Sequence, residues 1–139
     1  MTVPGKKPPP DQYNPNIELI ELAKLLTVSE QTLGSEHPDT LQSSHSVAVG
    51  FYNLGRFEDA VRLCAQTLEI RQRVLGLEHP DTLQSRNYLA HGYLKLGRVV
   101  EAVRHYEKTL INRERVLGPD HPDTVQTRDD LDIAYRLSD

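Results

Sequence analysis

The tetrapeptide His-Pro-Asp-Thr occurs three times in the chain, beginning at residues 37, 79 and 121, and each copy starts 42 residues after the one before. Residues 34–75 align on residues 76–117 without a gap, with 23 identities in 42 positions. A fixed period of this length is typical of repeat proteins, in which each unit packs on its neighbours. We therefore expect two full repeats, 34–75 and 76–117, flanked by half repeats at 17–33 and 118–139.

Each repeat is predicted to form two helices separated by a turn. In the second copy, apolar residues recur at three- and four-residue spacing on both sides of Leu96-Gly97-Arg98. Gly97, like Gly55 one repeat earlier, suits the left-handed conformation in which many helices end. Extended over the chain, this register predicts about six helices, at roughly 17–33, 37–53, 57–74, 79–95, 99–116 and 121–137.

The repeated tetrapeptide is interpreted as the start of a helix. Proline at the first helical position has no amide to leave unpaired, and Asp81 places negative charge at the positive end of the helix dipole. A metal site is the first alternative, but equivalent histidines in stacked repeats lie roughly 15–20 Å apart, too far to share one ion. The J-domain of co-chaperones also contains His-Pro-Asp, but in one loop between helices. Helix capping is favoured over both.

Composition excludes several classes of protein. No apolar run approaches the roughly 20 residues of a membrane span, and no secretory signal is present. The single cysteine, Cys64, has no partner for an intrachain disulfide, so we expect a reducing, cytoplasmic setting and a buried thiol. The net charge of −4 disfavours nucleic acid as a ligand, because phosphate binding needs a clustered basic face.

Residues 1–16 are expected to form a disordered, proline-rich tail. The segment holds five prolines and almost nothing that could join a core. A linker is the simpler interpretation, and a ligand for a proline-binding domain is the alternative. The segment has no P-x-x-P spacing, so we assign it no role.

The repeat resembles a known family. The pattern Leu89-Ala90-x-x-Tyr93, Gly97-Arg98, Ala102 and Tyr106-x-x-Thr109-Leu110 resembles the tetratricopeptide repeat. The 42-residue length, the G-x-x-H-P-D-T-L linker and the R-x-R-V-L ending are similar to the subclass found in kinesin light chains and in the sensor arrays of bacterial and fungal signal-transducing NTPases. The resemblance covers residues 17–139. It implies an all-α fold, a right-handed solenoid of antiparallel helix pairs.

The two ends depart from this pattern at the positions where paired helices cross. Ala60 and Ala102 are small, but the equivalent residue in the first helix is Glu18; similarly, Ala48 and Ala90 correspond to Asp132 in the last helix. Each acid faces a helix that the sequence does not supply. We expect a chain finished at these ends rather than a slice of a longer array.

No set of residues predicts catalysis. Ser43, Ser44 and Ser46 lie beside His45, but on one helical segment a nucleophile, a base and an orienting acid do not converge. The sequence has no glycine-rich phosphate loop and no paired-cysteine metal spacing. We therefore expect a protein that is not an enzyme and that uses no cofactor or metal.

The resemblance implies that a peptide or protein segment binds in a concave groove lined by the first helix of each repeat. The groove positions of the family fall on Gln42, His45, Val49, Tyr52 and Asn53, then on Gln84, Asn87, His91, Leu94 and Lys95, and finally on Gln126, Asp129, Ile133, Arg136 and Leu137. Members that bind chaperone tails clamp a carboxylate with lysine and asparagine, where this chain has His45 and Val49. A peptide of mixed character is therefore expected rather than an acidic tail.

Self-assembly is a second hypothesis. The first helix is apolar around much of its circumference, with Ile17, Ile20, Leu22 and Leu25 among its residues. The tail could fold back over this surface, or a second copy could dock on it to form a homodimer. A third hypothesis is an engineered or excised repeat fragment of a larger signalling protein.

Overall fold

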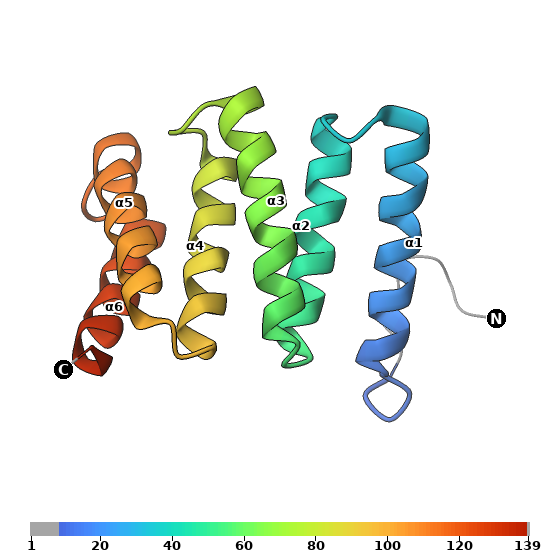
Figure 1. Cartoon of the computed structure of the whole chain (residues 1–139), viewed down its shortest axis with the longest axis horizontal. Helices are drawn as coiled ribbons and strands as arrows, with labels where there is room; N and C mark the ends of the chain where they lie inside the picture. The colour runs from blue at the N-terminus through green and yellow to red at the C-terminus, as the bar shows by residue number, and fades with distance from the viewer. Residues whose placement is uncertain (1–8, 139) are drawn as a thin grey trace.

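The computed structural model describes residues 9–138, which form six α-helices and no strand. The helices are α1 (Pro15–Leu33), α2 (Pro38–Asn53), α3 (Phe57–Leu75), α4 (Pro80–Lys95), α5 (Val99–Leu117) and α6 (Pro122–Leu137). They stand side by side in chain order, with α1 at one edge and α6 at the other (Figure 1). Within this part of the chain, no helix has the length and apolar character needed to cross a membrane. The predicted all-α solenoid is confirmed.

The His-Pro-Asp-Thr motif starts α2, α4 and α6 in the same way. In each, the histidine is the N-cap and proline opens the helix. The imidazole Nδ1 of His37, His79 and His121 accepts a hydrogen bond from the backbone amide of the aspartate two residues later, at 3.1 Å. The helix start was predicted correctly, but the histidine itself supplies the capping acceptor.

Helix α1 begins two residues earlier than predicted. The side chain of Asn14 caps it by accepting from the Asn16 amide at 2.9 Å, and Pro15 takes the first helical position. Before the cap, residues 9–12 form a turn closed by a hydrogen bond from the Gln12 amide to the Pro9 carbonyl. The rest of the predicted tail, residues 1–8, lies outside the described residues.

The turns inside the two repeats depend on glycine. Gly55 and Gly97 have φ of 76° and 77°, as predicted for residues that end a helix. The following amide, of Arg56 or Arg98, returns to the carbonyl of Phe51 or Tyr93 at 2.9 Å. A residue with a Cβ would be strained at this φ, so the turn that pairs the helices requires glycine.

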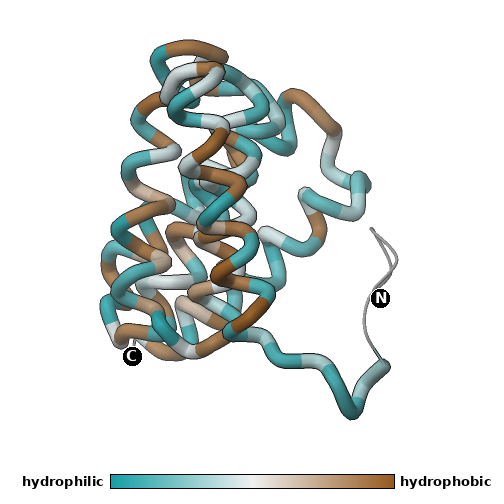
Figure 2. The backbone as a smooth tube through the Cα atoms, turned by 90° about the vertical axis from the view of Figure 1, so that its right-hand side faces the viewer, coloured by the Kyte–Doolittle hydropathy of each residue, from teal (hydrophilic) through white to brown (hydrophobic). Residues whose placement is uncertain are grey.

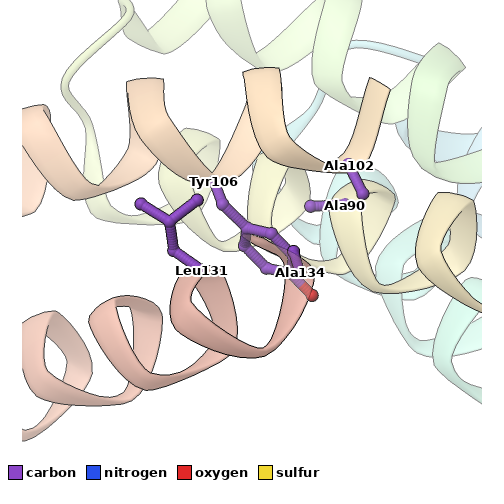
Figure 3. Packing of buried hydrophobic residues seen from close by; sticks show 5 residues of the cluster. All are labelled: Ala90, Ala102, Tyr106, Leu131 and Ala134. Atoms are coloured by element: carbon purple, nitrogen blue, oxygen red, sulfur yellow. The ribbon is translucent and has the colours of Figure 1, made fainter. Parts of the chain in front are cut away.

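Packing is local along the solenoid. Each helix packs chiefly on its neighbours in the chain, with a weaker contact between α2 and α4. The core is divided accordingly: one cluster contains Ala48, Cys64, Leu68 and Leu89, and the next contains Ala90, Ala102, Tyr106, Leu131 and Ala134 (Figure 3). Seen from the α1 edge, apolar residues recur along the helices (Figure 2). One core cluster per repeat is the arrangement of a repeat protein.

The predicted helix crossings are tight. Ala90 and Ala102 are both 0% exposed and belong to one core cluster. On the other side of α4, a Cβ added to Gly92 would lie 2.6 Å from Cγ2 of Val61 in α3, so only glycine permits this approach. Glu18 is half-buried, and Asp132 is exposed. The small residues therefore lie where helices meet, and the two acids lie on the end helices.

Buried arginines join consecutive repeats. Arg71, on α3, donates to the Asp81 carbonyl at 3.0 Å and to Oγ of Ser85 at 2.9 Å, both on α4. One repeat later, Arg113 of α5 donates to Oγ1 of Thr127 on α6 at 2.7 Å. These arginines are 1% and 8% exposed. Each guanidinium thus satisfies polar groups of the following repeat inside the solenoid.

Candidate functional site

Two neighbouring hollows lie on the side of the solenoid formed by α2, α4 and α6, which we name the α2–α4–α6 face. The first, of about 460 Å³, is lined by Tyr13, Pro15, Glu18, Leu19, Leu22, Gln42, His45, Ser46, Val49, Gly50, Asn53, Gln84 and Tyr88. The second, of about 410 Å³, is lined by Pro80, Asp81, Gln84, Asn87, Tyr88, His91, Arg113, Asp123 and Gln126. Because Gln84 and Tyr88 belong to both, the hollows adjoin across α4.

Aromatic rings pack on one another near this junction, and those of His45, Tyr88 and His91 line the hollows. The ring of Tyr88 meets His45 edge-on at 5.1 Å between centroids and His91 at 5.5 Å. Tyr52 lies 6.3 Å from both Tyr88 and His91, and His91 lies 5.5 Å from Tyr106. These five residues are named the aromatic cluster. Contacts of this kind between aromatic rings hold the side chains in fixed positions and combine apolar area with a few polar atoms.

His91 is the polar centre of the cluster. Its Nδ1 is hydrogen-bonded to the hydroxyl of Tyr106, and its Nε2 lies 3.2 Å from the Asn87 amide nitrogen. Because that amide donates, Nε2 accepts, and the proton of the neutral imidazole lies on Nδ1. Burial lowers the pKa of His91, and the Asp130 carboxylate, 3.9 Å from Nε2, opposes that shift. His91 is thus held in one orientation.

Burial also shifts the pKa of His45, which lines the first hollow, and of Cys64, which lies in the core cluster of α2, α3 and α4. Burial lowers the pKa of His45 to about 4, helped by the charge of Arg71 and opposed by Asp81, so the imidazole is neutral near pH 7. Burial raises the pKa of the Cys64 thiol to about 12, which keeps it protonated and unreactive. Among residues 9–138, no three His, Cys, Asp or Glu side chains gather closely enough to hold a metal ion. The hollows offer amides, neutral imidazoles and aromatic surface, together with the charged side chains of Glu18, Asp81, Arg113 and Asp123.

Most of the predicted groove residues lie at the hollows. Gln42, His45, Val49, Asn53 and Gln84 line the first, while Gln84, Asn87, His91 and Gln126 line the second. Tyr52 belongs to the aromatic cluster, and Leu94 packs against the core cluster of α4, α5 and α6. Lys95, Asp129, Ile133, Arg136 and Leu137 are exposed and line neither hollow.

Sequence reasoning missed one repeat position on this face. Ser46, Tyr88 and Asp130 occupy equivalent places, and each follows a glutamine of the face by four residues. Ser46 and Tyr88 line the hollows, and Asp130 accepts from the Gln126 amide at 3.0 Å. Residues four apart share one side of a helix, so spacing from Gln42, Gln84 and Gln126 was the signal that could have found them.

The antiparallel helix pairs and the 42-residue register define an all-α repeat solenoid. A family model for the tetratricopeptide repeat matches residues 46–110 and 81–139. The chain belongs to the tetratricopeptide repeat family. Repeats of this family generally mediate protein–protein interactions and serve as scaffolds.

Solved structures agree with this assignment. A Podosopora anserina protein described as a kinesin light chain with nearly identical TPR-like repeats is 31% identical over 89% of this chain and 59% of its own, with a TM-score of 0.85. A variant of that protein gives the same identity and TM-score, with 58% of its chain covered. BtubC (BKLC) from P. vanneervenii shares the fold, with a TM-score of 0.81 and 23% identity over 89% of this chain and 50% of its own. No curated protein sequence matches. The chain spans 50–59% of these structures' lengths.

Proposed function

We propose that the chain is a non-catalytic module that binds a segment of a partner protein along the α2–α4–α6 face. The observation that carries this proposal is that the two hollows adjoin at Gln84 and Tyr88. A segment lying across α4 would enter both, so one ligand can contact all three helices. Contacts from several repeats to one extended ligand suit a solenoid.

The groups on the face indicate the chemistry of the ligand. Gln42, Gln84 and Gln126 offer one carboxamide per repeat, each able to donate and accept. Tyr88 and Val49 offer apolar area. Because His45 and His91 are kept neutral by burial, the face has no cationic clamp made of histidine. These groups favour a segment of mixed character that is bound through its backbone and its apolar side chains, rather than an acidic tail.

The test uses peptides selected from a random library on the immobilised chain. The double variant Gln84→Ala/Gln126→Ala should lower the affinity for the selected peptides by at least about tenfold. It removes two carboxamides that the bound peptide would bury and hydrogen-bond. The matched control is Gln31→Ala/Gln66→Ala, which removes two exposed glutamines from α1 and α3. Asn87 and His91 are less suitable positions, because their hydrogen bonds also hold the fold. Peptides that bind both variants as tightly as the wild type would place the site elsewhere.

Self-association through α1 is a second candidate function. Ile17, Ile20 and Leu25 are 55%, 54% and 55% exposed, which supports contact with another surface. Ile20→Ser/Leu22→Ser should convert a homodimer to a monomer by light scattering. A wild-type chain that is already monomeric at high concentration removes this candidate.

A cytoplasmic setting is also a proposal, supported by the unpaired, buried Cys64.

A further inference from the structure

Arg86 on α4 is a buried cation without a partner in the described part of the chain. It is only 5% exposed, yet it makes no hydrogen bond or ion pair with any of residues 9–138. The buried arginines Arg71 and Arg113, in contrast, each donate to a hydroxyl of the next repeat. A buried charge that is not paired destabilises a fold. An anion from outside the chain would therefore be stabilised beside Arg86.

The third copy of the motif shows which group is missing. Arg128 of α6 is the equivalent of Arg86, and its Nη2 lies 3.3 Å from Oε1 of Glu114 on α5. The residue equivalent to Glu114 one repeat earlier is Gln72 of α3, which carries no charge. The middle repeat thus keeps the arginine and lacks the carboxylate that pairs with it.

Helix α5 forms the other side of this place. Ser44 is the equivalent of Arg86 in the first repeat, and it is hydrogen-bonded to Thr67 of α3 at 2.7 Å. Arg86 therefore faces the equivalent residue of α5, Thr109. His105 lies one helical turn before Thr109, and its Nδ1 is buried without a hydrogen-bond partner among residues 9–138. The side chain of Arg86 thus has uncharged polar groups around it and no acid.

The charges near Arg86 match a ligand with a single negative charge. Burial lowers the pKa of Arg86, and no neighbouring charge opposes that shift. Burial also lowers the pKa of His105, helped by the charges of Arg86 and Lys108 and opposed by Glu101, so the imidazole is neutral near pH 7. One guanidinium near a neutral imidazole suits a carboxylate, which carries one charge and accepts two parallel N–H bonds.

We propose that Arg86 is the anchor of a carboxylate-binding site between α3 and α5. The carboxylate of the ligand takes the place that Glu114 takes beside Arg128, and the guanidinium of Arg86 donates to its oxygens. The carboxylate belongs either to a small molecule or to an acidic side chain of another protein. Arg86 lines neither hollow, so this site is separate from the one on the α2–α4–α6 face.

The test compares the melting temperature of the 139-residue chain in sodium acetate and in sodium chloride, at equal concentrations and pH 7, by differential scanning calorimetry. A ligand that binds only the folded chain stabilises it, so acetate should raise the melting temperature of the wild type by about 3 °C relative to chloride. Arg86→Met should lose most of this difference, because it removes the cation that holds the carboxylate.

Two pentapeptides with blocked ends distinguish the sources of the carboxylate. One has the sequence Ala-Ala-Glu-Ala-Ala, and the other has glutamine in place of the glutamate. Stabilisation by the glutamate peptide and not by the glutamine peptide supports an acidic side chain as the ligand. Stabilisation by acetate, with no effect of the glutamate peptide, supports a small carboxylate.

Gln72→Glu supplies the missing acid from within the chain. It should raise the melting temperature in chloride and abolish the additional effect of acetate, because the new carboxylate pairs with Arg86 as Glu114 pairs with Arg128. Gln31→Glu, the same change at an exposed residue of α1, is the matched control and should keep the full acetate effect. An acetate effect of equal size in the wild type, Arg86→Met and Gln72→Glu would be a general effect of the salt and would overturn the proposal. A wild-type chain that melts at the same temperature in both salts would also overturn it.

Discussion

The guanidinium of Arg71 on α3 donates to Oγ of Ser85 on α4 at 2.9 Å, with Arg71 only 1% exposed. The same nitrogen donates to the Asp81 carbonyl at 3.0 Å. Arg113 and Thr127 repeat the side-chain contact one unit later, at 2.7 Å. Desolvation lowers the pKa of both arginines, so each buried charge depends on these partners. The buried guanidinium groups of Arg71 and Arg113 are therefore part of the interface between consecutive repeats.

Arg71→Ala is expected to lower the free energy of unfolding by about 3 kcal/mol, because it leaves a cavity and two buried acceptors without a donor. The measurement is urea unfolding followed by circular dichroism. Arg73→Ala is the control: its side chain is 60% exposed, and its ion pair with Glu36 is at the surface, so the loss should stay below about 1 kcal/mol. Comparable losses in the two variants would mean that burial of Arg71 contributes nothing specific.

Ala90→Glu is expected to destabilise the chain by about 2–4 kcal/mol, since it places a carboxylate without a partner at a helix crossing where Ala90 is 0% exposed. The comparison is Asp132→Glu, which changes an exposed acid at the equivalent position of α6 and should stay within about 0.5 kcal/mol. Urea unfolding of both variants checks the repeat register, and equal stabilities would contradict it.

Features that depend on the repeat itself could be predicted from the sequence. The period placed Gly55 and Gly97 in their turns and Ala90 and Ala102 at a crossing, because the same local geometry must be formed twice. The helix bounds were predicted within two residues. The early start of α1 was missed because it depends on one side-chain acceptor, Asn14, rather than on periodicity.

Features that depend on a neighbouring repeat were harder to predict. No pattern in the sequence distinguishes Arg71 and Arg113 from exposed arginines, and only the position of the next first helix shows that they are buried. Tyr88 was missed because the transferred groove positions did not include it, although helical spacing from Gln84 did. The hydrogen bond between His91 and Tyr106 could not be predicted from the sequence, because Tyr106 lies on the other helix of the pair.

His79→Ala is expected to lower the free energy of unfolding by about 1 kcal/mol, the usual effect of removing a capping acceptor. The cause is loss of the hydrogen bond that Nδ1 accepts from the Asp81 amide at 3.1 Å. His79→Asn should recover most of that loss, because asparagine is among the best capping residues. Urea unfolding distinguishes the two variants. If asparagine destabilises as much as alanine, the histidine contributes through something other than its cap.

His45 should make stability depend on pH. Its folded pKa of about 4 lies below the ordinary value of 6.5, mainly because of burial. As the pH falls, the unfolded chain binds a proton first, so the stabilisation is fully present above about pH 6.5 and is lost as the pH approaches 4. The two values correspond to a loss of up to about 3 kcal/mol.

His45→Asn, which copies the residue at position 87 in the next repeat, removes this titration. Burial also lowers the pKa of His91 and His105, and these groups remain in both chains. Urea unfolding at several pH values between about 7 and 4 should therefore show a shallower decline for His45→Asn than for the wild type, with the two curves converging toward low pH. Parallel curves would mean that His45 is not held neutral by the fold. Convergence of the two curves would mean that the His45 imidazole at the first hollow is neutral in the folded chain near pH 7.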